Sequence, residues 1–178
     1  MSRTDRLGAI DDWLLDRLFQ PITDYLTGLL GERLTAFDLG MSLQLGAVVL
    51  DLAADLADFA AGRMGAADGL YDGLSGACGV WFYVYLSRQR ALVRPGKANP
   101  LRHLYRSLRL LALAFAAWGL LSGIMPGGTG ALSAGLSALS GLAFVAGLYC
   151  IACQPRPPGW RRAARETVDM RHASPLPS

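Results

Sequence analysis

The stretch from Leu110 to Pro155, LLALAFAAWGLLSGIMPGGTGALSAGLSALSGLAFVAGLYCIACQP, decides the fold of this chain. Its 46 residues include no Asp, Glu, Lys, Arg or His, and Pro126-Gly127-Gly128 interrupts it near the middle. A helix needs about 20 apolar residues to cross the hydrocarbon core of a bilayer. Helices of water-soluble domains show a polar side within a few turns. The stretch therefore predicts two transmembrane helices joined by a tight turn.

Charge is distributed unevenly along the 178 residues, of which 52% are hydrophobic. Of the 14 acidic residues, 12 lie at or before Asp72, whereas 12 of the 17 Lys and Arg residues follow it. Such asymmetry around apolar segments is typical of a protein that is oriented in a membrane. The cations flank apolar spans and have no separate folded surface to present them. We therefore expect a lipid bilayer as the partner and no nucleic acid.

The pattern predicts an all-α integral membrane bundle of four helices in two hairpins, preceded by an amphipathic helix. The predicted regions are an N-terminal segment at 1–37, spans at 38–62, 69–87, 107–125 and 129–153, a basic loop at 88–106 and a basic, Pro-containing tail at 154–178. Basic segments stay in the cytoplasm, and the excess of Arg, Ala and Gly favours a bacterial source. We expect an inner-membrane protein with both termini cytoplasmic. Whether the hairpin 38–87 spans the bilayer or lies at its interface stays open.

The N-terminal segment has apolar side chains at helical spacing from Ile10 to Leu29 and acidic side chains on the other side. Pro21 is expected to kink or split this helix. An acidic face is weakly attracted to anionic lipid headgroups, so we expect docking on protein. The basic segment 88–109 has the complementary charge. The sequence thus predicts that the acidic face of residues 11–24 docks there, and cysteines at Asp16 and Arg102 would test it by crosslinking.

A polar stripe follows one face of the first predicted span. At about 100° per residue its members fall within a narrow arc. They are Gln44, Asp51, Asp55 and Asp58. Ionisable residues in a span often mark a path for ions or protons. Three interpretations stay open: such a path, a stripe that lies in water at the interface, and hydrogen bonding between helices.

Small residues recur at every fourth position on the last two predicted spans. They are Gly119, Gly123, Ser133, Ser137 and Gly141. Small residues let helix backbones approach closely in lipid. The pattern predicts helix packing, either within this chain or between copies of it.

Cys150 and Cys153 have the spacing of a redox pair or of half a zinc site. A zinc site needs two more ligands, and Cys78 and His103 lie in other segments. We expect ordinary thiols that the cytoplasm keeps reduced, and neither a metal nor another cofactor.

The sequence contains no Ser-His-Asp, His-Glu-x-x-His or paired-carboxylate pattern with a nearby base. We therefore expect a non-enzymatic accessory or scaffold subunit that contacts other membrane proteins or further copies of itself. One alternative is a small ion or proton channel or transporter that uses the acidic stripe. Another is a prophage-type membrane-permeabilising protein, which the size and the hairpins favour.

Overall fold

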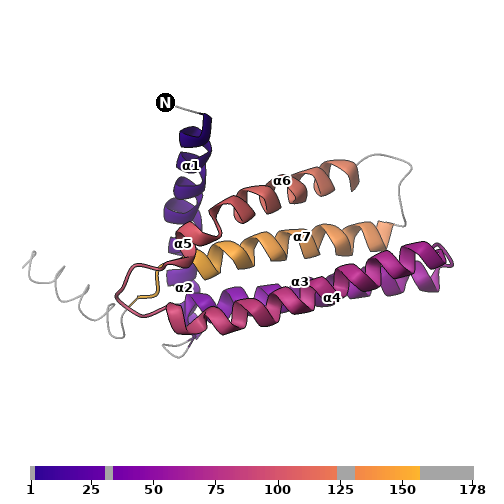
Figure 1. The fold of residues 1–178 in the computed structure, drawn as a ribbon, viewed down its shortest axis with the longest axis horizontal. Helices are drawn as coiled ribbons and strands as arrows, with labels where there is room; N and C mark the ends of the chain where they lie inside the picture. The colour runs from indigo at the N-terminus through magenta and orange to yellow at the C-terminus, as the bar shows by residue number, and fades with distance from the viewer. Residues whose placement is uncertain (1–2, 31–33, 124–130, 157–178) are drawn as a thin grey trace, which may run out of the picture.

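A computed structural model describes residues 3–30, 34–123 and 131–156, and all regular structure in these ranges is helical. The predicted all-α class is confirmed. The four long helices follow the long axis of the molecule, with α6 inclined to the others (Figure 1). They are α3 (Ala36–Ala60), α4 (Ala66–Arg88), α6 (Arg106–Gly123) and α7 (Ala131–Ala152). The predicted turn at 126–129 and residues 157–178 of the predicted tail 154–178 lie outside the described residues.

The segment predicted as a basic loop between α4 and α6 is partly helical. It contains the short helices η2 (Gln89–Leu92) and α5 (Leu101–Leu104). Asn99 anchors it to the end of α7: its Nδ2 donates to the carbonyl oxygens of Ile151 (2.7 Å) and Cys153 (2.9 Å). Its Oδ1 accepts from the Leu101 N–H at 3.0 Å. One buried side chain thus satisfies carbonyls at the end of α7 and a backbone donor at the start of α5.

Local sequence signals set both ends of α3. At its start the Thr35 N–H donates to Asp38 Oδ2 (3.1 Å) and the Asp38 N–H donates to Thr35 Oγ1 (3.2 Å), which is a capping box. At its end Gly62 adopts a φ of 66°, which favours glycine. The N–H of Arg63 then bonds to the Asp58 carbonyl at 3.0 Å, as in a Schellman motif.

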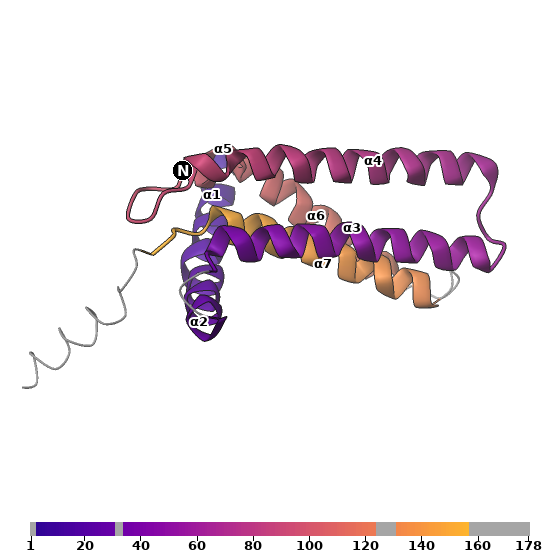
Figure 2. The same ribbon diagram turned by 90° about the horizontal axis from the view of Figure 1, so that it is seen from below.

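The N-terminal helix crosses the end of the bundle where α3 begins and α7 ends (Figures 1 and 2). Its sections α1 (Arg3–Trp13), η1 (Leu14–Phe19) and α2 (Gln20–Leu30) follow one another without a break. Of the two outcomes predicted at Pro21, a kink or a split, the split is wrong, and the irregularity is a wide π-helical turn, η1, just before the proline. In an α-helix the ring of Pro21 would clash with the carbonyl of residue 17. A wider turn moves that carbonyl away.

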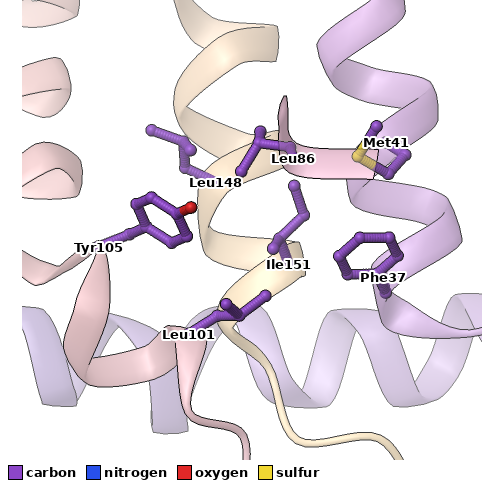
Figure 3. Packing of buried hydrophobic residues seen from close by; sticks show 7 residues of the cluster. All are labelled: Phe37, Met41, Leu86, Leu101, Tyr105, Leu148 and Ile151. Carbon is purple, nitrogen blue, oxygen red and sulfur yellow. The ribbon is translucent and has the colours of Figure 1, made fainter. Parts of the chain in front are cut away.

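The buried apolar core is concentrated at this same end of the bundle. One cluster, shown in Figure 3, comprises Phe37, Met41, Leu86, Leu101, Tyr105, Leu148 and Ile151. A second cluster comprises Leu15, Ala36, Val145, Tyr149, Ala152 and Cys153. Both draw on the start of α3 and the end of α7. This end is therefore packed like a protein interior.

The tightest helix pair is α3 with α7, which are far apart in the sequence. A Cβ added at Gly147 would lie only 2.9 Å from the carbonyl oxygen of Gly40, so the two backbones are in close approach. Gln44 Nε2 donates to the Phe144 carbonyl at 2.8 Å, and Ser140 Oγ donates to a backbone carbonyl of α3 at 2.9 Å. Small residues and interhelical hydrogen bonds are how helices associate in lipid.

Two helices of the described chain are long and apolar enough to cross a bilayer. They are α3, with a mean hydropathy of 1.5, and Leu132–Ala152 of α7, with a mean hydropathy of 1.8. Only 28% and 39% of their most apolar windows is buried within the chain, so much of their apolar surface faces outward. This result indicates membrane association. The bundle of four spans stays a prediction, because α4 and the described residues of α6 do not meet the same criterion.

Candidate functional site

Ion pairs join the acidic side of the N-terminal helix to arginines of α5 and α6. Arg102 donates to both Asp16 oxygens at 2.9 and 2.8 Å, and to Asp12 Oδ1 at 3.1 Å. Arg106 Nη2 donates to Asp12 Oδ2 at 3.0 Å. The predicted docking of the acidic face on the basic segment, including the Asp16 and Arg102 pair, is confirmed. We call this contact the arginine–aspartate interface.

The centre of the arginine–aspartate interface is a buried pair. The side chains of Asp11 and Arg109 are both fully buried. Arg109 Nε donates to Asp11 Oδ1 at 3.1 Å, and Arg109 Nη2 donates both to Asp11 and to the Arg102 carbonyl, the latter at 2.8 Å. Burial costs a guanidinium and a carboxylate several kcal/mol of hydration each, and their attraction offsets this cost only when the two are held together. The pair therefore fixes the N-terminal helix against the first turn of α6.

Tyr149 of α7 provides the apolar support for this contact. The Phe19 ring stacks on the Tyr149 ring at a centroid distance of 4.6 Å. The Arg109 guanidinium lies over the Tyr149 ring, 5.4 Å from its centroid, in a cation–π arrangement. Thus one aromatic side chain contacts both the N-terminal helix and its buried arginine partner.

The chain that leaves α7 is held by α2. The Gln154 N–H donates to Gln20 Oε1 at 2.8 Å, and Gln20 Nε2 donates back to the Gln154 carbonyl at 3.1 Å. Further along, Arg156 Nη2 donates to Asp24 Oδ2 at 3.0 Å. The N-terminal helix therefore contacts both the segment before α6 and the segment after α7.

In the exposed region of the interface, Asp16 and Arg102 affect each other's pKa. The hydrogen bond from Arg102 lowers the pKa of Asp16 below its ordinary value, and this outweighs the opposing effect of partial burial. Asp16 in turn raises the pKa of Arg102. Each partner stabilises the ionised form of the other, so docking is strongest where both are charged.

The members of the polar stripe predicted on the first span have different neighbours in the structure. Gln44 is buried against α7. Asp51 and Asp55 are partly buried, and Asp72 of α4 acts on both electrostatically. Asp58 forms an ion pair with Arg63 at 2.6 Å. The structure thus separates Gln44, which joins two helices, from the acids near the α3 and α4 turn.

The predicted small packing residues lie in different surroundings. Ser133 is buried, and Gly141 is in contact range of Ala116 on α6. Ser137 is exposed, and a Cβ added at Gly119 would meet no atom within 4 Å. Gly123 ends α6, and its surroundings lie outside the described residues. Within the described chain, a closer approach of two helices occurs at Gly40 and Gly147.

The cysteines are all free thiols. Cys150 and Cys153 are buried at the end of α7, whereas Cys78 is exposed on α4. Within residues 3–30, 34–123 and 131–156 there is no group of three His, Cys, Asp or Glu side chains that could hold a metal ion. Cys150 and Cys153 together supply only two of the four ligands that a structural zinc site uses.

Sequence reasoning missed two features of the site, the role of Asn99 and the pairs that Arg106 and Arg109 form beside Arg102, and each has a local signal. Asn99 precedes Pro100, and an Asn-Pro pair is typical of a turn. Arg102, Arg106 and Arg109 recur at intervals of four and three, which places them on one helical face. That face could have been matched to the aspartates of the N-terminal helix.

Comparison with known proteins gives no relative: no protein family, curated protein or solved structure matches this chain.

Proposed function

We propose that this chain is a non-enzymatic, multi-pass protein of the bacterial inner membrane that crosses the bilayer four times and serves as an accessory or scaffold subunit. The observation that carries the proposal is the outward placement of large apolar side chains on all four long helices. Examples are Leu52 and Phe59 on α3, Leu70 and Trp81 on α4, Phe115 and Trp118 on α6, and Leu132 and Leu139 on α7. In water such surfaces promote aggregation, whereas lipid hydrocarbon solvates them.

The lengths of α4 and α6 also support four spans. At 1.5 Å per residue, the 23 residues of α4 extend over about 35 Å and the 18 residues of α6 over about 27 Å. The hydrocarbon core is about 30 Å thick. The charges of α4 lie in its first two turns, at Asp68 and Asp72, and in its last turn, at Arg88, and those of α6 lie at Arg106 and Arg109. The middle of each helix is free of charged residues.

Charge supports an orientation with the arginine–aspartate interface in the cytoplasm. The segment that joins α4 to α6 lies at the same end of the bundle as the chain that leaves α7 (Figure 1). This segment and the adjoining turns of α4 and α6 carry the cations Arg88, Arg90, Arg94, Lys97, Arg102, Arg106 and Arg109. The described turn between α3 and α4 carries Arg63 alone. Trp81 and Tyr85 stack at 5.7 Å just before Arg88, where a membrane–water boundary favours aromatic residues.

A scaffold role fits the use that the chain makes of its charged residues. Arg102, Arg106 and Arg109 pair with aspartates of the N-terminal helix. These contacts stabilise one arrangement of helices at the cytoplasmic end. A rigid end with an outward apolar surface is suited to hold other membrane proteins in place.

Cysteine accessibility on each side of the membrane tests the four-span topology. In a Cys78→Ala background, Gly65→Cys lies in the α3–α4 turn and Ala98→Cys lies in the exposed α4–α6 segment. We expect a membrane-impermeant maleimide to label Gly65→Cys in intact spheroplasts, and to label Ala98→Cys only after permeabilisation. Labelling of both sites from the same side would contradict four spans.

A second candidate, an ion or proton channel, is favoured by one observation. Asp51, Asp55 and Asp72 bring three carboxyl groups into electrostatic contact across the α3–α4 hairpin. A channel that uses them predicts proton or cation flux in proteoliposomes, lowered in Asp51→Asn/Asp55→Asn. Flux that is absent, or unchanged in that variant, would exclude this candidate and leave the scaffold role in place.

A further inference from the structure

We propose that the N-terminal helix lies in the plane of the membrane, at its arginine end, with one face inserted into the lipid hydrocarbon. This inference rests on the proposed membrane topology. It adds a helix in the membrane plane to the spanning helices and the segments that connect them. The inserted surface, which we call the apolar face, comprises Ile10, Trp13, Leu18, Ile22, Tyr25 and Leu29. All six side chains are between 43% and 65% exposed.

The wide turn η1 keeps these six residues on one face. In an unbroken α-helix the five-residue step from Trp13 to Leu18 would rotate the stripe by about 140°. One extra residue in a π-helical turn reduces that rotation to about 40°. The apolar residues before and after η1 (Leu14–Phe19) therefore lie on one continuous strip. The irregularity of the helix thus preserves an exposed surface that has no packing role within the described chain.

The N-terminal helix lies beside the last turns of α7. Leu15 shares a buried cluster with Val145 and Tyr149. Val145 precedes Ala152, the last residue of α7, by seven residues, which is about 10 Å along a helix. If α7 spans the bilayer, the N-terminal helix lies at the depth where headgroups give way to hydrocarbon. An exposed apolar surface at that depth contacts lipid.

The three sides of the N-terminal helix have three different environments. Asp12 and Asp16 contact arginines at the end of the bundle, and Leu15 and Thr23 are buried. The apolar face lies about 120° around the helix from the buried side. The acids lie on the opposite flank of the buried side. Because Asp12 and Asp16 contact arginines at the end of the bundle, and the apolar face lies away from them, the proposal directs the apolar face toward the membrane interior.

Charge pairing removes the obstacle that an acidic helix meets at an anionic membrane. Amphipathic surface helices usually carry Lys and Arg on their polar face. Here the polar face carries Asp11, Asp12 and Asp16, and arginines of the same chain neutralise them. The arginine–aspartate interface thus supplies the positive charge that this helix lacks.

Spin labels in the full chain, reconstituted in phosphatidylethanolamine–phosphatidylglycerol vesicles, test the proposal. The background is Cys78→Ala, because Cys150 and Cys153 are buried. Ile22→Cys reports on the apolar face, and Gly28→Cys, exposed on the side of Asp24, is its matched control. Leu52→Cys, exposed on α3, is the reference for a spanning helix.

We expect the ratio of collision rates with oxygen and with a water-soluble nickel chelate to be several-fold higher at Ile22 than at Gly28, and close to that at Leu52. A low ratio at Ile22 with a high one at Leu52 would overturn the in-plane helix and leave the spans intact. Low accessibility to both reagents at Ile22 means that protein, such as a second copy, covers the face, which also overturns it. Low ratios at both Ile22 and Leu52 would instead contradict the membrane topology.

A label-free measurement covers the case in which a labelled variant does not fold. Trp13 belongs to the apolar face and is 59% exposed. Lipids brominated near the headgroup end of their chains should quench a larger fraction of the fluorescence in the unmodified chain than in Trp13→Phe. Equal fractional quenching in the two proteins would overturn the insertion of this face.

Discussion

Asp11 and Arg109 form an ion pair in which neither side chain is exposed, and they come from segments 98 residues apart. The pair holds the N-terminal helix to the first turn of α6, next to the Tyr149 ring. When two charges are buried together, removing one side chain leaves the charge of the other uncompensated. The stability of this end of the bundle is therefore sensitive to the pair.

Removing one partner should be far more damaging than removing both. Arg109→Met leaves the Asp11 carboxylate buried alone, and we expect the free energy of unfolding in mild detergent to fall by about 3–5 kcal/mol. Asp11→Leu/Arg109→Met should recover most of that loss. Arg90→Met is the control, because the Arg90 side chain in its pair with Asp38 is 67% exposed and such pairs contribute about 1 kcal/mol or less. Equal losses in Arg109→Met and Arg90→Met would contradict a buried pair.

The docking of the N-terminal helix should be detectable by crosslinking. In the Cys78→Ala background, Asp16→Cys/Arg102→Cys should form an intramolecular crosslink with a short bismaleimide, because the two native side chains are in hydrogen-bond contact. The pairs of Asp11 and Asp12 remain to hold the helix. Leu18→Cys/Arg102→Cys, which uses the apolar face, should react much less. Similar yields in the two variants would mean that the helix is not held in this register.

Acid should weaken the exposed region of the interface with a defined sign. Arg102 holds the pKa of Asp16 below its ordinary value of 3.8, so the folded state favours the ionised carboxylate. This stabilisation is complete above pH 3.8 and is lost as the pH falls through the lowered pKa. The stability difference between the native chain and Asp16→Asn should therefore be constant near neutral pH and shrink below pH 3.8. Because Asp16 is exposed, this stability difference should stay below about 1 kcal/mol. A difference that grows on acidification would reverse this sign.

The close approach of α3 and α7 makes a sharp prediction for two glycines of one helix. A Cβ at Gly147 would lie 2.7 Å from Gln44 Nε2 and 2.9 Å from the Gly40 carbonyl. Gly147→Ala should therefore force the helices apart and cost about 1–3 kcal/mol in thermal unfolding experiments. A Cβ at Gly135 would meet no atom within 4 Å, so Gly135→Ala should be nearly neutral. Equal stability of the two variants would show that α3 and α7 are not in contact here.

The long helices and the docking contact could be predicted from sequence because each depends on a strong local pattern. The apolar run 110–155 contains α7 and most of α6, and Thr35 with Asp38 marks the start of α3. The separation of acids from arginines was sufficient to pair Asp16 with Arg102. In each case the pattern of residues along the chain carries the information, without knowledge of which helices are neighbours.

The remaining features depend on three-dimensional neighbours that no single-sequence pattern specifies. The repeat of small residues from Ser133 to Gly141 pointed to one face of α7, whereas Gly147 lies at the close contact because it meets Gly40. The wide turn before Pro21 preserves an apolar strip that becomes visible only when the docked side is known. Likewise, Asn99 can bond to backbone carbonyls only because the end of α7 lies next to it.

Alkaline carbonate extraction of membranes that contain the full chain tests the central claim most directly, because it separates proteins held by lipid from those held by surface charge. Four spanning helices predict that the chain remains in the membrane pellet at high pH and is released only by detergent. Release into the supernatant as a monomer that stays dissolved without detergent would contradict a membrane-spanning bundle.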